Sequence, residues 1–462
     1  MEYRVQLMDT IASINPTTGK AFQQFQPYDE DRIDQAVKRA RLAFEDWRNL
    51  DVSERSKYLI DVASVIRDRK HELGEMITIE MGKPIKQSVP EVEKCAQMFE
   101  YFARNAEWLL EPEAVGGDLP SSSISFEPMG TVLCIKPWNF PLWQVLSAAS
   151  HVLAGGNVVL LKHSSYVPGC ALEIERIFIE AGLPEGTFQT LLIDGPTASG
   201  LIERDGINAV SFTGGLPAGR MVAEAAARNM KKCVCELGGS DPFIVLEDAN
   251  LKEAAKVAAA GRLINAGQTC IASKRFIVAD TIAKEFTARF VEQTRDRVIG
   301  DPLDPNTDIG PLVRNRSIIL LEGQVRDAVA KGAGVALEGG RIPGPGYFFS
   351  PVILSGVSCD MKVMREETFG PVAPIITFRD EDEAIRYAND TDFGLGASIW
   401  GKDLDRVRLF AGDIQAGVVG VNGFFTPQAD LPFGGVKMSG VGRELSHFGF
   451  YEFMNIKATK IY

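Results

Sequence analysis

The sequence predicts an α/β protein built on doubly wound parallel sheets. From residue 131 onward, short apolar runs alternate with helical stretches, which is the rhythm of repeated βαβ units. The runs are apolar throughout, as expected for parallel strands that are buried on both faces of a sheet. The rhythm occurs in two successive series, so we expect two such sheets.

The first hundred residues are predicted to be helical. Residues 33–47 and 55–73 carry apolar side chains at helical spacing among many charges. A break rich in Gly, Pro and Ser follows at residues 116–123. Alternating apolar residues over 122–126 predict a strand just before the first α/β series.

The first α/β series contains five predicted strands, at residues 131–135, 158–161, 188–193, 209–212 and 233–237. A helix is expected over 169–181, because Gly182-Leu183-Pro184 after it is a helix stop. The second series has predicted strands at residues 243–246, 275–278, 372–378, 397–400 and 418–422, with helices at 251–265, 282–297, 382–389 and 403–411. Two series indicate two domains, and ligand sites preferentially occupy the cleft between domains.

Composition excludes several functional classes. The chain has 462 residues, which corresponds to two or three domains at roughly 100–200 residues each. A formal net charge of −12 argues against a nucleic-acid partner. We find neither an export signal nor an apolar run long enough for a bilayer, so we expect a cytoplasmic protein that has no membrane partner.

The cysteines and histidines do not form a metal-binding pattern. There are seven cysteines, which we expect to be reduced, and no CxxC pair occurs. Cys233 and Cys235 are spaced to share one face of a strand. The four histidines form no ligand cluster, so we expect no metal site.

Three residues are candidates for chemistry. Cys270 follows Gly267-Gln268-Thr269, and Gly267 can end the preceding helix in a left-handed conformation, which would display the thiol on a turn. Glu236 lies at the end of a predicted parallel strand, where a carboxylate points into the ligand crevice and can act as a general base. Asn139, in the loop after strand 131–135, can donate to a developing oxyanion.

Further residues suit a nucleotide. Lys162 ends another strand, where a lysine suits ribose hydroxyls or a phosphate. Gly214, Gly215 and Gly219 precede or enter a helical stretch and allow close approach of a pyrophosphate, although the spacing is not GxGxxG. Glu367 could bond a ribose, and Phe369 could pack against a planar ring. Taken singly, the candidates for chemistry and for nucleotide binding all have ordinary structural explanations. Cys270 could be a buried inert cysteine, Glu236 a solvated charge, Asn139 a turn asparagine, Lys162 a surface lysine, and the glycines could simply form turns.

Taken together, the motifs resemble the aldehyde dehydrogenase superfamily. They are Pro137-Trp-Asn-Phe-Pro141, Glu236-Leu-Gly-Gly239, Gly267-Gln-Thr-Cys270 and Glu366-Glu-Thr-Phe-Gly-Pro371, in this order. Ser13-Ile-Asn-Pro-Thr-Thr-Gly19, Glu80-Met-Gly-Lys-Pro84 and Pro432-Phe-Gly-Gly-Val-Lys-Met-Ser-Gly440 extend the similarity nearly from end to end. Within the superfamily, the segments from Trp138, at Lys162-His163 and from Gly442 look like the succinate-semialdehyde dehydrogenase branch.

The resemblance implies an architecture and a mechanism. The fold would be a modified Rossmann cofactor domain (1–109 and 129–238), an α/β catalytic domain (239–438) and a small β oligomerisation arm (110–128 and 439–462). Cys270 would be the nucleophile, Asn139 with the backbone N–H of Cys270 the oxyanion hole, and Glu236 the base that activates water. The residues implied to hold the dinucleotide are Ile135, Pro137, Trp138, Lys162, Ser165, Thr213, Gly214, Gly215, Gly219, Leu237, Gly238, Glu367 and Phe369.

The implied function is NAD(P)-dependent oxidation of a small aldehyde to its acid by a homodimer or homotetramer, with succinate semialdehyde as the expected substrate. Three departures from the family pattern bear on it. Gly215 stands where the family usually has a serine that contacts the pyrophosphate. Ser165 stands where members that prefer NAD often carry Glu, so a group that repels the 2′-phosphate is missing and we expect NADP to be slightly favoured over NAD. Ser147 stands where an Arg could grip a substrate carboxylate.

Three alternatives to this function are another acceptor for the acyl group, another aldehyde as substrate, and a protein without catalytic activity. Acyl transfer to coenzyme A could use the same thioester, but a water-activating Glu236 would waste the intermediate. A different short-chain aldehyde is compatible with Ser147. A non-catalytic relative that keeps only the fold is disfavoured, because both Cys270 and Glu236 are present.

Overall fold

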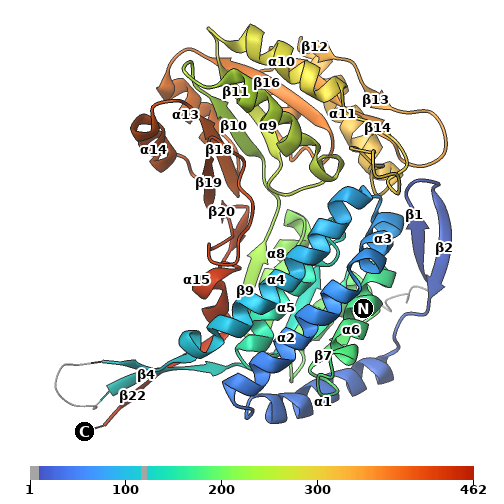
Figure 1. Ribbon diagram of the computed structural model, residues 1–462, viewed down its shortest axis with the longest axis vertical. Helices are drawn as coiled ribbons and strands as arrows, with labels where there is room; N and C mark the ends of the chain where they lie inside the picture. The colour runs from blue at the N-terminus through green and yellow to red at the C-terminus, as the bar shows by residue number, and fades with distance from the viewer. Residues whose placement is uncertain (1–9, 116–121, 462) are drawn as a thin grey trace.

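The computed structural model describes residues 10–115 and 122–461. Residues 116–121 of the break predicted at 116–123 lie outside the described residues, as do residues 1–9 and 462 of the expected domains. Figure 1 shows two lobes, one above the other, and a narrow projection from the lower lobe that contains β4 and β22. Each lobe is built on one large sheet, which confirms the α/β class predicted from the alternating apolar runs.

The lower lobe contains a six-stranded sheet in the order β21-β9-β8-β5-β6-β7. The strands are β5 (Thr131–Lys136), β6 (Val158–His163), β7 (Phe188–Thr190), β8 (Ala209–Thr213), β9 (Lys232–Glu236) and β21 (Gly440–Val441). All neighbours are parallel except β21 and β9. The chain winds outward from β5 to β7 and then returns to the other side of β5, so the sheet is doubly wound.

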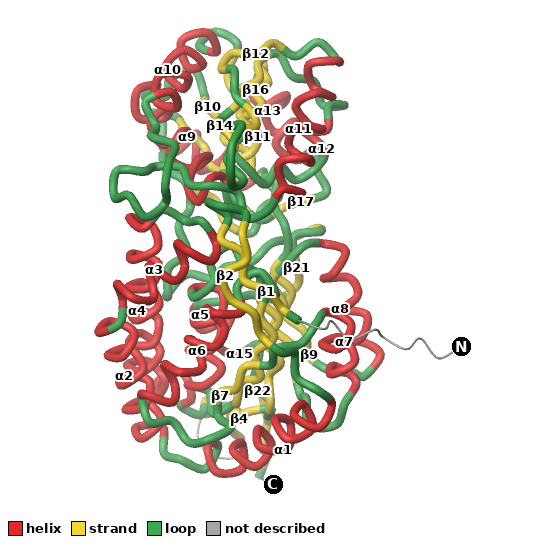
Figure 2. Tube along the Cα trace, turned by 90° about the vertical axis from the view of Figure 1, so that its right-hand side faces the viewer, coloured by secondary structure: helices red, strands yellow, loops and turns green. Residues whose placement is uncertain are grey.

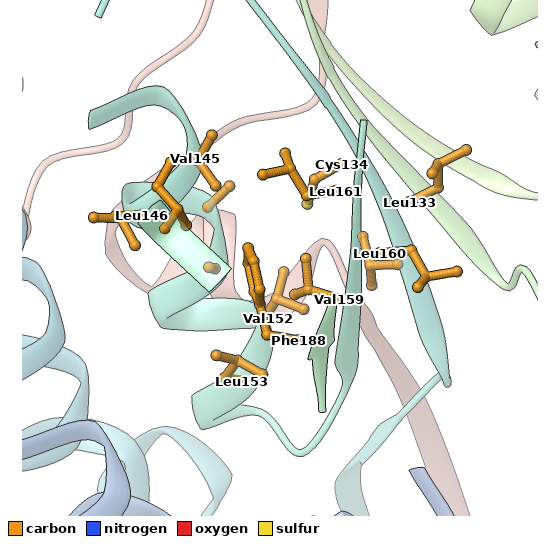
Figure 3. Close-up of a cluster of buried hydrophobic side chains, with 14 of the residues drawn as sticks. Leu133, Cys134, Val145, Leu146, Val152, Leu153, Val159, Leu160, Leu161 and Phe188 are labelled. Atoms are coloured by element: carbon orange, nitrogen blue, oxygen red, sulfur yellow. The ribbon is translucent and has the colours of Figure 1, made fainter. Parts of the chain in front are cut away.

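Helices pack against this sheet, and the apolar side chains between helices and strands form the core of the lower lobe. They are α1 (Glu30–Trp47), α2 (Val52–Asp68), α3 (Lys70–Met81), α4 (Ile85–Leu110), α5 (Trp143–Ala154), α6 (Pro168–Glu180), α7 (Gly195–Glu203) and α8 (Leu216–Arg228). Figure 3 shows Cys134, Val159 and Leu161 on the side of the sheet that faces α5, with Leu133 and Leu160 on the other side. Both faces of the strands are therefore buried, as the uninterrupted apolar runs predict.

Some elements differ from the sequence prediction. The helix expected over 55–73 is two helices, because the backbone at Arg69 (φ −97°, ψ 10°) leaves the helical region between α2 and α3. The Arg69 guanidinium pairs with three carboxylates, Glu72, Glu173 and Glu180, and this joins the bend to α6. The strand expected over 188–193 ends at Thr190, because the chain then turns towards Asp194, the N-cap of α7.

The upper lobe contains a seven-stranded sheet in the order β12-β15-β16-β11-β10-β18-β19. Its strands are β10 (Asp241–Val245), β11 (Ser273–Ala279), β12 (Gly334–Leu337), β15 (Val352–Ser355), β16 (Val372–Phe378), β18 (Gly396–Trp400) and β19 (Val418–Val421). Its helices are α9 (Leu251–Leu263), α10 (Ala283–Arg295), α11 (Asn315–Ala330), α12 (Lys362–Arg365), α13 (Glu381–Asn389) and α14 (Leu404–Gly412). Separate apolar clusters lie on the two faces of this sheet.

Two smaller features connect or extend the lobes. A hairpin of β1 (Ile11–Asn15) and β2 (Lys20–Phe25) runs alongside both lobes (Figure 2). Its tip receives a hydrogen bond from the Tyr347 N–H to the Pro16 carbonyl, 3.0 Å. The projection consists of β4 (Ser122–Pro128) between β22 (Met454–Lys460) and the short β3 (Glu113–Ala114), all antiparallel (Figure 1). After β21, helix α15 (Ser446–Tyr451) leads into β22.

Within the described ranges, no helix is long and apolar enough to cross a membrane. The same residues contain no group of three or more His, Cys, Asp or Glu side chains that could hold a metal ion. The sulfurs of Cys233 and Cys235 lie 3.5 Å apart, so the two side chains share one face of β9 as their spacing predicts.

Candidate active site

The predicted site residues of the lower lobe gather at one edge of its sheet. The carboxyl ends of neighbouring parallel strands meet at this edge, and the point where the winding reverses lies beside β5. Pro137, Trp138 and Asn139 follow β5, Lys162 is next to last in β6, and Thr213 and Glu236 end β8 and β9. Residues far apart in the sequence are therefore brought together by topology alone.

The loop that carries Cys270 is tightly folded. Helix α9 ends at Leu263, two residues before the predicted end, and a short 3₁₀ turn (Ile264–Gly267) follows. Asn265, Ala266 and Gly267 all have positive φ, so the left-handed conformation predicted for Gly267 begins two residues earlier. A Cβ at Gly267 would lie 2.6 Å from the backbone of Gly370, so this position has room for glycine only.

A cavity of about 380 Å³ lies between the lobes and brings Cys270 and Asn139 together. The lower lobe contributes nine lining residues: Pro137, Trp138, Asn139, Gln144, Thr213, Gly214, Gly215, Leu237 and Gly238. The upper lobe contributes nine more: Cys270, Arg314, Ser317, Leu320, Leu321, Gln324, Glu366, Glu367 and Phe369. An interdomain cleft was the position expected from the two α/β series.

Hydrogen bonds fix Asn139 to the Cys270 loop. Its side-chain amide donates to the carbonyl oxygen of Gln268, 3.1 Å, and its backbone carbonyl accepts from the Asn265 amide, 2.7 Å. The Asn139 amide uses one of its two N–H groups in this way. The other can donate to an oxygen that develops charge beside Cys270.

The electrostatic environment of Cys270 keeps its sulfur protonated at neutral pH. Burial raises the pKa of the thiol to about 12, and the carboxylates of Asp241, Glu367 and Glu236 act in the same direction. The ammonium of Lys274 opposes them. A thiolate nucleophile therefore requires a base that accepts the proton.

Glu236 is completely buried beside this site. Burial raises the pKa of its carboxyl well above the ordinary value, and the charge of Glu444 adds to the effect. Neither carboxylate oxygen has a hydrogen-bond partner among the described residues. Glu236 does not line the cavity; its Oε1 lies so close to Gly434 that a Cβ there would be 2.6 Å away. To reach an acylated sulfur, the carboxyl must turn or act through water.

A buried ion pair behind Glu236 could not be predicted from local sequence patterns. The Lys136 ammonium lies 2.7 Å from Glu444 Oε1 and donates to the hydroxyls of Ser211 (2.9 Å) and Thr213 (3.0 Å). Lys136 lowers the pKa of Glu236, which Glu444 raises. These residues come from β5, β8 and the segment before α15, and the spacing of any one of them gives no indication of the pair.

Lys274 is a second residue that sequence patterns did not identify. Its fully buried ammonium donates to the carbonyl oxygens of Gly239 (2.7 Å) and Cys270 (2.5 Å) and lies 2.9 Å from Glu367 Oε1. One cation thus fixes both the nucleophile loop and the predicted ribose-binding carboxylate. The sequence signal that could have identified Lys274 is its position four residues after the candidate nucleophile Cys270.

A second cavity, of about 260 Å³, lies farther along the same sheet edge. Lys162 and Ser165 line it together with Asp194, Tyr28 and the first turn of α7. Burial lowers the pKa of the Lys162 ammonium, and Asp194 acts in the opposite direction. The predicted ribose and 2′-phosphate residues therefore share one space.

The two cavities fit a dinucleotide. Gly214 and Gly215 lie before α8, whose first backbone N–H groups point towards the cleft end of the helix. The rings of Trp138 and Phe369 pack edge to face, 5.7 Å apart, at the cavity beside Cys270. Gly219 lines neither cavity; a Cβ there would meet Leu237 at 2.4 Å, so it permits close packing of α8 on the strand end. Ile135, in β5, also lies outside both cavities.

Comparisons with known proteins agree with this arrangement. A sequence model described as the aldehyde dehydrogenase family matches residues 4–459. The chain is 44% identical to a probable NADP(+) succinate-semialdehyde dehydrogenase of Synechocystis, over 98% of this chain and 99% of that one. It is 42% identical to an Escherichia coli NAD(P)+ succinate semialdehyde dehydrogenase, over 97% of each chain.

Solved structures give the same result. The crystal structure of a succinic semialdehyde dehydrogenase from Streptococcus pyogenes, in complex with NADP+, superposes with a TM-score of 0.95 at 34% identity. The alignment covers 98% of this chain and 99% of the other. With the model match over almost its whole length, the chain belongs to the aldehyde dehydrogenase family.

Proposed function

We propose that this enzyme oxidises a short-chain aldehyde to its carboxylic acid with NAD(P)+, through a thioester on Cys270. The observation that carries the proposal is the shared cavity. It holds a thiol, an amide donor bonded to the thiol's own loop, and a strip of glycines, an acid and an aromatic ring that suits a dinucleotide.

The first half of the reaction would use Cys270 and Asn139. The thiol gives its proton to a base, and the sulfur forms a bond with the aldehyde carbon while the carbonyl electron pair moves to oxygen. The Asn139 amide donates to this oxyanion, and one such donor is worth roughly 3–4 kcal/mol. Lys162, Glu367 and Phe369 line the cavities that would hold the dinucleotide, which would supply the acceptor for the hydride that leaves this carbon. Cys270 would then be left as a thioester.

The second half would use Glu236. Its carboxylate removes a proton from a water molecule, whose oxygen bonds to the thioester carbon as the carbon–sulfur bond breaks. The acid leaves, and Cys270 is regenerated. The raised pKa of Glu236 supports this role, because a carboxylate with a higher pKa accepts a proton from water more readily.

The best-supported substrate is succinate semialdehyde, from the names of the relatives. Ser147 cannot replace the expected Arg as a partner for the substrate carboxylate, because the Ser147 hydroxyl already donates to the Trp143 carbonyl within α5, at 2.6 Å. Recognition of a distal carboxylate would therefore fall to other groups. NADP is slightly favoured over NAD as the cofactor, because Lys162 and Ser165 line the second cavity without a Glu at position 165.

A paired assay tests the proposal. Succinate semialdehyde and butanal have chains of the same length, and each is supplied with NAD+ and with NADP+ while the reduced cofactor is followed by absorbance. We expect acid production from succinate semialdehyde, with kcat/KM higher for NADP+, and no activity for Cys270→Ala. Activity of Cys270→Ala equal to that of the wild type would refute the thioester mechanism. A preference for butanal would refute the assignment of succinate semialdehyde as the substrate.

A further inference from the structure

The lower-lobe wall of the groove has few donors for a cofactor diphosphate. Gly215 is the N-cap of α8 and makes no side-chain cap bond, since it has no hydroxyl. Pro217, in the first turn, removes one of the backbone N–H groups that a helix N-terminus would offer. The diphosphate carries two negative charges, so this wall alone neutralises it poorly.

Arg314 lies across the cavity from these glycines. It is the extended residue before α11 in the upper lobe, and it lines the same cavity as Gly214 and Gly215. Its Nη1 donates to the Tyr166 hydroxyl, and the guanidinium carbon lies 4.9 Å from the centre of the Tyr166 ring. Tyr166 directly follows Ser165, so Arg314 lines one cavity and contacts the sequence neighbour of a residue that lines the other.

The charge of Arg314 is not neutralised by the residues around it. Its Nε is buried and has no hydrogen-bond partner among residues 10–115 and 122–461. The acids of the cavity wall are already engaged: Glu367 with Lys274, 2.9 Å, and Glu366 with Gln324, 3.4 Å. A partly buried cation with a buried, unbonded N–H is costly unless an anion completes its bonds.

We propose that Arg314 binds the diphosphate of the nicotinamide dinucleotide from the upper lobe and replaces the hydroxyl that Gly215 lacks. A guanidinium presents a planar pair of N–H groups that matches phosphate oxygens, which a lysine cannot reproduce. Because Tyr166 belongs to the lower lobe, the bound diphosphate and Arg314 together would join both sides of the groove. The inference rests on the proposed dinucleotide-dependent function.

The test measures binding rather than turnover. Dissociation constants of NADH and NADPH are obtained from nicotinamide fluorescence for the full chain and for Arg314→Gln and Arg314→Lys. We expect Arg314→Gln to weaken both cofactors by about the same factor, on the order of tenfold or more, as for loss of a charge-assisted hydrogen bond. Arg314→Lys should recover part of the affinity for both.

Two further variants isolate the effect. Arg316→Gln removes an exposed arginine two residues away on α11 and should leave both constants unchanged. Ser165→Glu should weaken NADPH alone. Unchanged binding by Arg314→Gln would overturn the inference, and so would a loss confined to NADPH, which would place the guanidinium at the 2′-phosphate. If the wild-type chain bound neither cofactor, the proposed function itself would fail.

Discussion

The carboxyl of Glu236 is buried and the thiol of Cys270 is partly buried at the cavity wall, and burial raises the pKa of each. A protonated thiol cannot begin the reaction, because the sulfur attacks as a thiolate. Each has a cation near it, Lys274 beside Cys270 and Lys136 beside Glu236, and each cation favours the charged form. The site thus disfavours the ionised forms of these two groups by burial, and it places beside each group a charge that stabilises the ionised form.

Glu236→Gln should separate the two halves of the reaction. The variant keeps the size of the side chain but cannot accept a proton, so hydride transfer should persist while thioester hydrolysis slows. We expect a rapid burst of about one reduced cofactor per site and then turnover lower by ~10²–10⁴-fold, the range for loss of a general base. Rapid mixing with absorbance detection measures both phases.

The pH dependence of this variant gives the second part of the same prediction. A general base acts in its deprotonated form, and a raised pKa moves that form to higher pH. Wild-type turnover should therefore rise with pH over a range above that of an ordinary carboxyl group, and in Glu236→Gln this dependence should be lost from the slow phase. A variant with no burst, or with a wild-type slow phase, would contradict the assignment of Glu236 to deacylation.

At the scale of elements, the packing of α8 against the end of β9 positions the cavity wall. Gly219 allows this close approach, since a Cβ there would lie 2.4 Å from Leu237 Cδ2. Leu237 lines the cavity and directly follows Glu236. A methyl group at position 219 would therefore push the helix away from the strand end or displace a residue of the site.

Gly219→Ala should consequently destabilise the protein and weaken the cofactor. Overpacking of this kind costs about 1–3 kcal/mol, which lowers the Tm by a few degrees, and dissociation constants for NADPH should rise. Gly200→Ala in α7 is the matched control, because nothing lies within 4 Å of a Cβ at that position. There, alanine should stabilise the helix by roughly 0.5–1 kcal/mol. Equal Tm changes in the two variants would refute the packing argument.

The pattern of apolar residues predicted the parallel strands, which are buried on both faces, and the helices that have one buried and one polar face. The parallel strands are apolar throughout, and β16 (Val372–Phe378) has the predicted bounds. Helix α5 was missed because every one of its residues is buried, so no polar face marks its turns. Cys270, Asn139 and Glu236 were found by motif and lie at adjoining strand and loop ends. Lys136, Lys274 and Arg314 were not picked out from the sequence, because their contacts are with partners that only the folded chain brings near.

At the scale of the whole molecule, the reactive groups come from different lobes. Cys270 belongs to the upper lobe and Asn139 to the lower one, and the bonds from Asn139 to Gln268 and Asn265 join them. The relative position of nucleophile and oxyanion donor thus depends on how the two sheets are held together. The β1–β2 hairpin, which contacts the upper lobe at Pro16 and α3 through Ser13 and Glu80, adds to this connection.

The projection formed by β3, β4 and β22 has no core of its own. Six of the seven residues of β22 are exposed, and no residue of β4 is fully buried. A small sheet of this kind is marginal in water, even though Phe126 of β4 stacks on Tyr451, and β22 is its edge strand among the described residues. We therefore expect a second copy of the chain to cover it, in line with the homodimer or homotetramer implied by the sequence resemblance.

Ile456→Lys tests this assembly. Ile456 is 58% exposed in the middle of β22, where an apolar side chain gains nothing in a monomer but would be buried against a partner. A lysine there should shift the mass measured by light scattering towards one chain. Leu409→Lys on α14, at a site 77% exposed and outside the projection, should leave the mass unchanged. A wild-type protein that elutes and scatters as a monomer would show that the strand edge is tolerated without a partner.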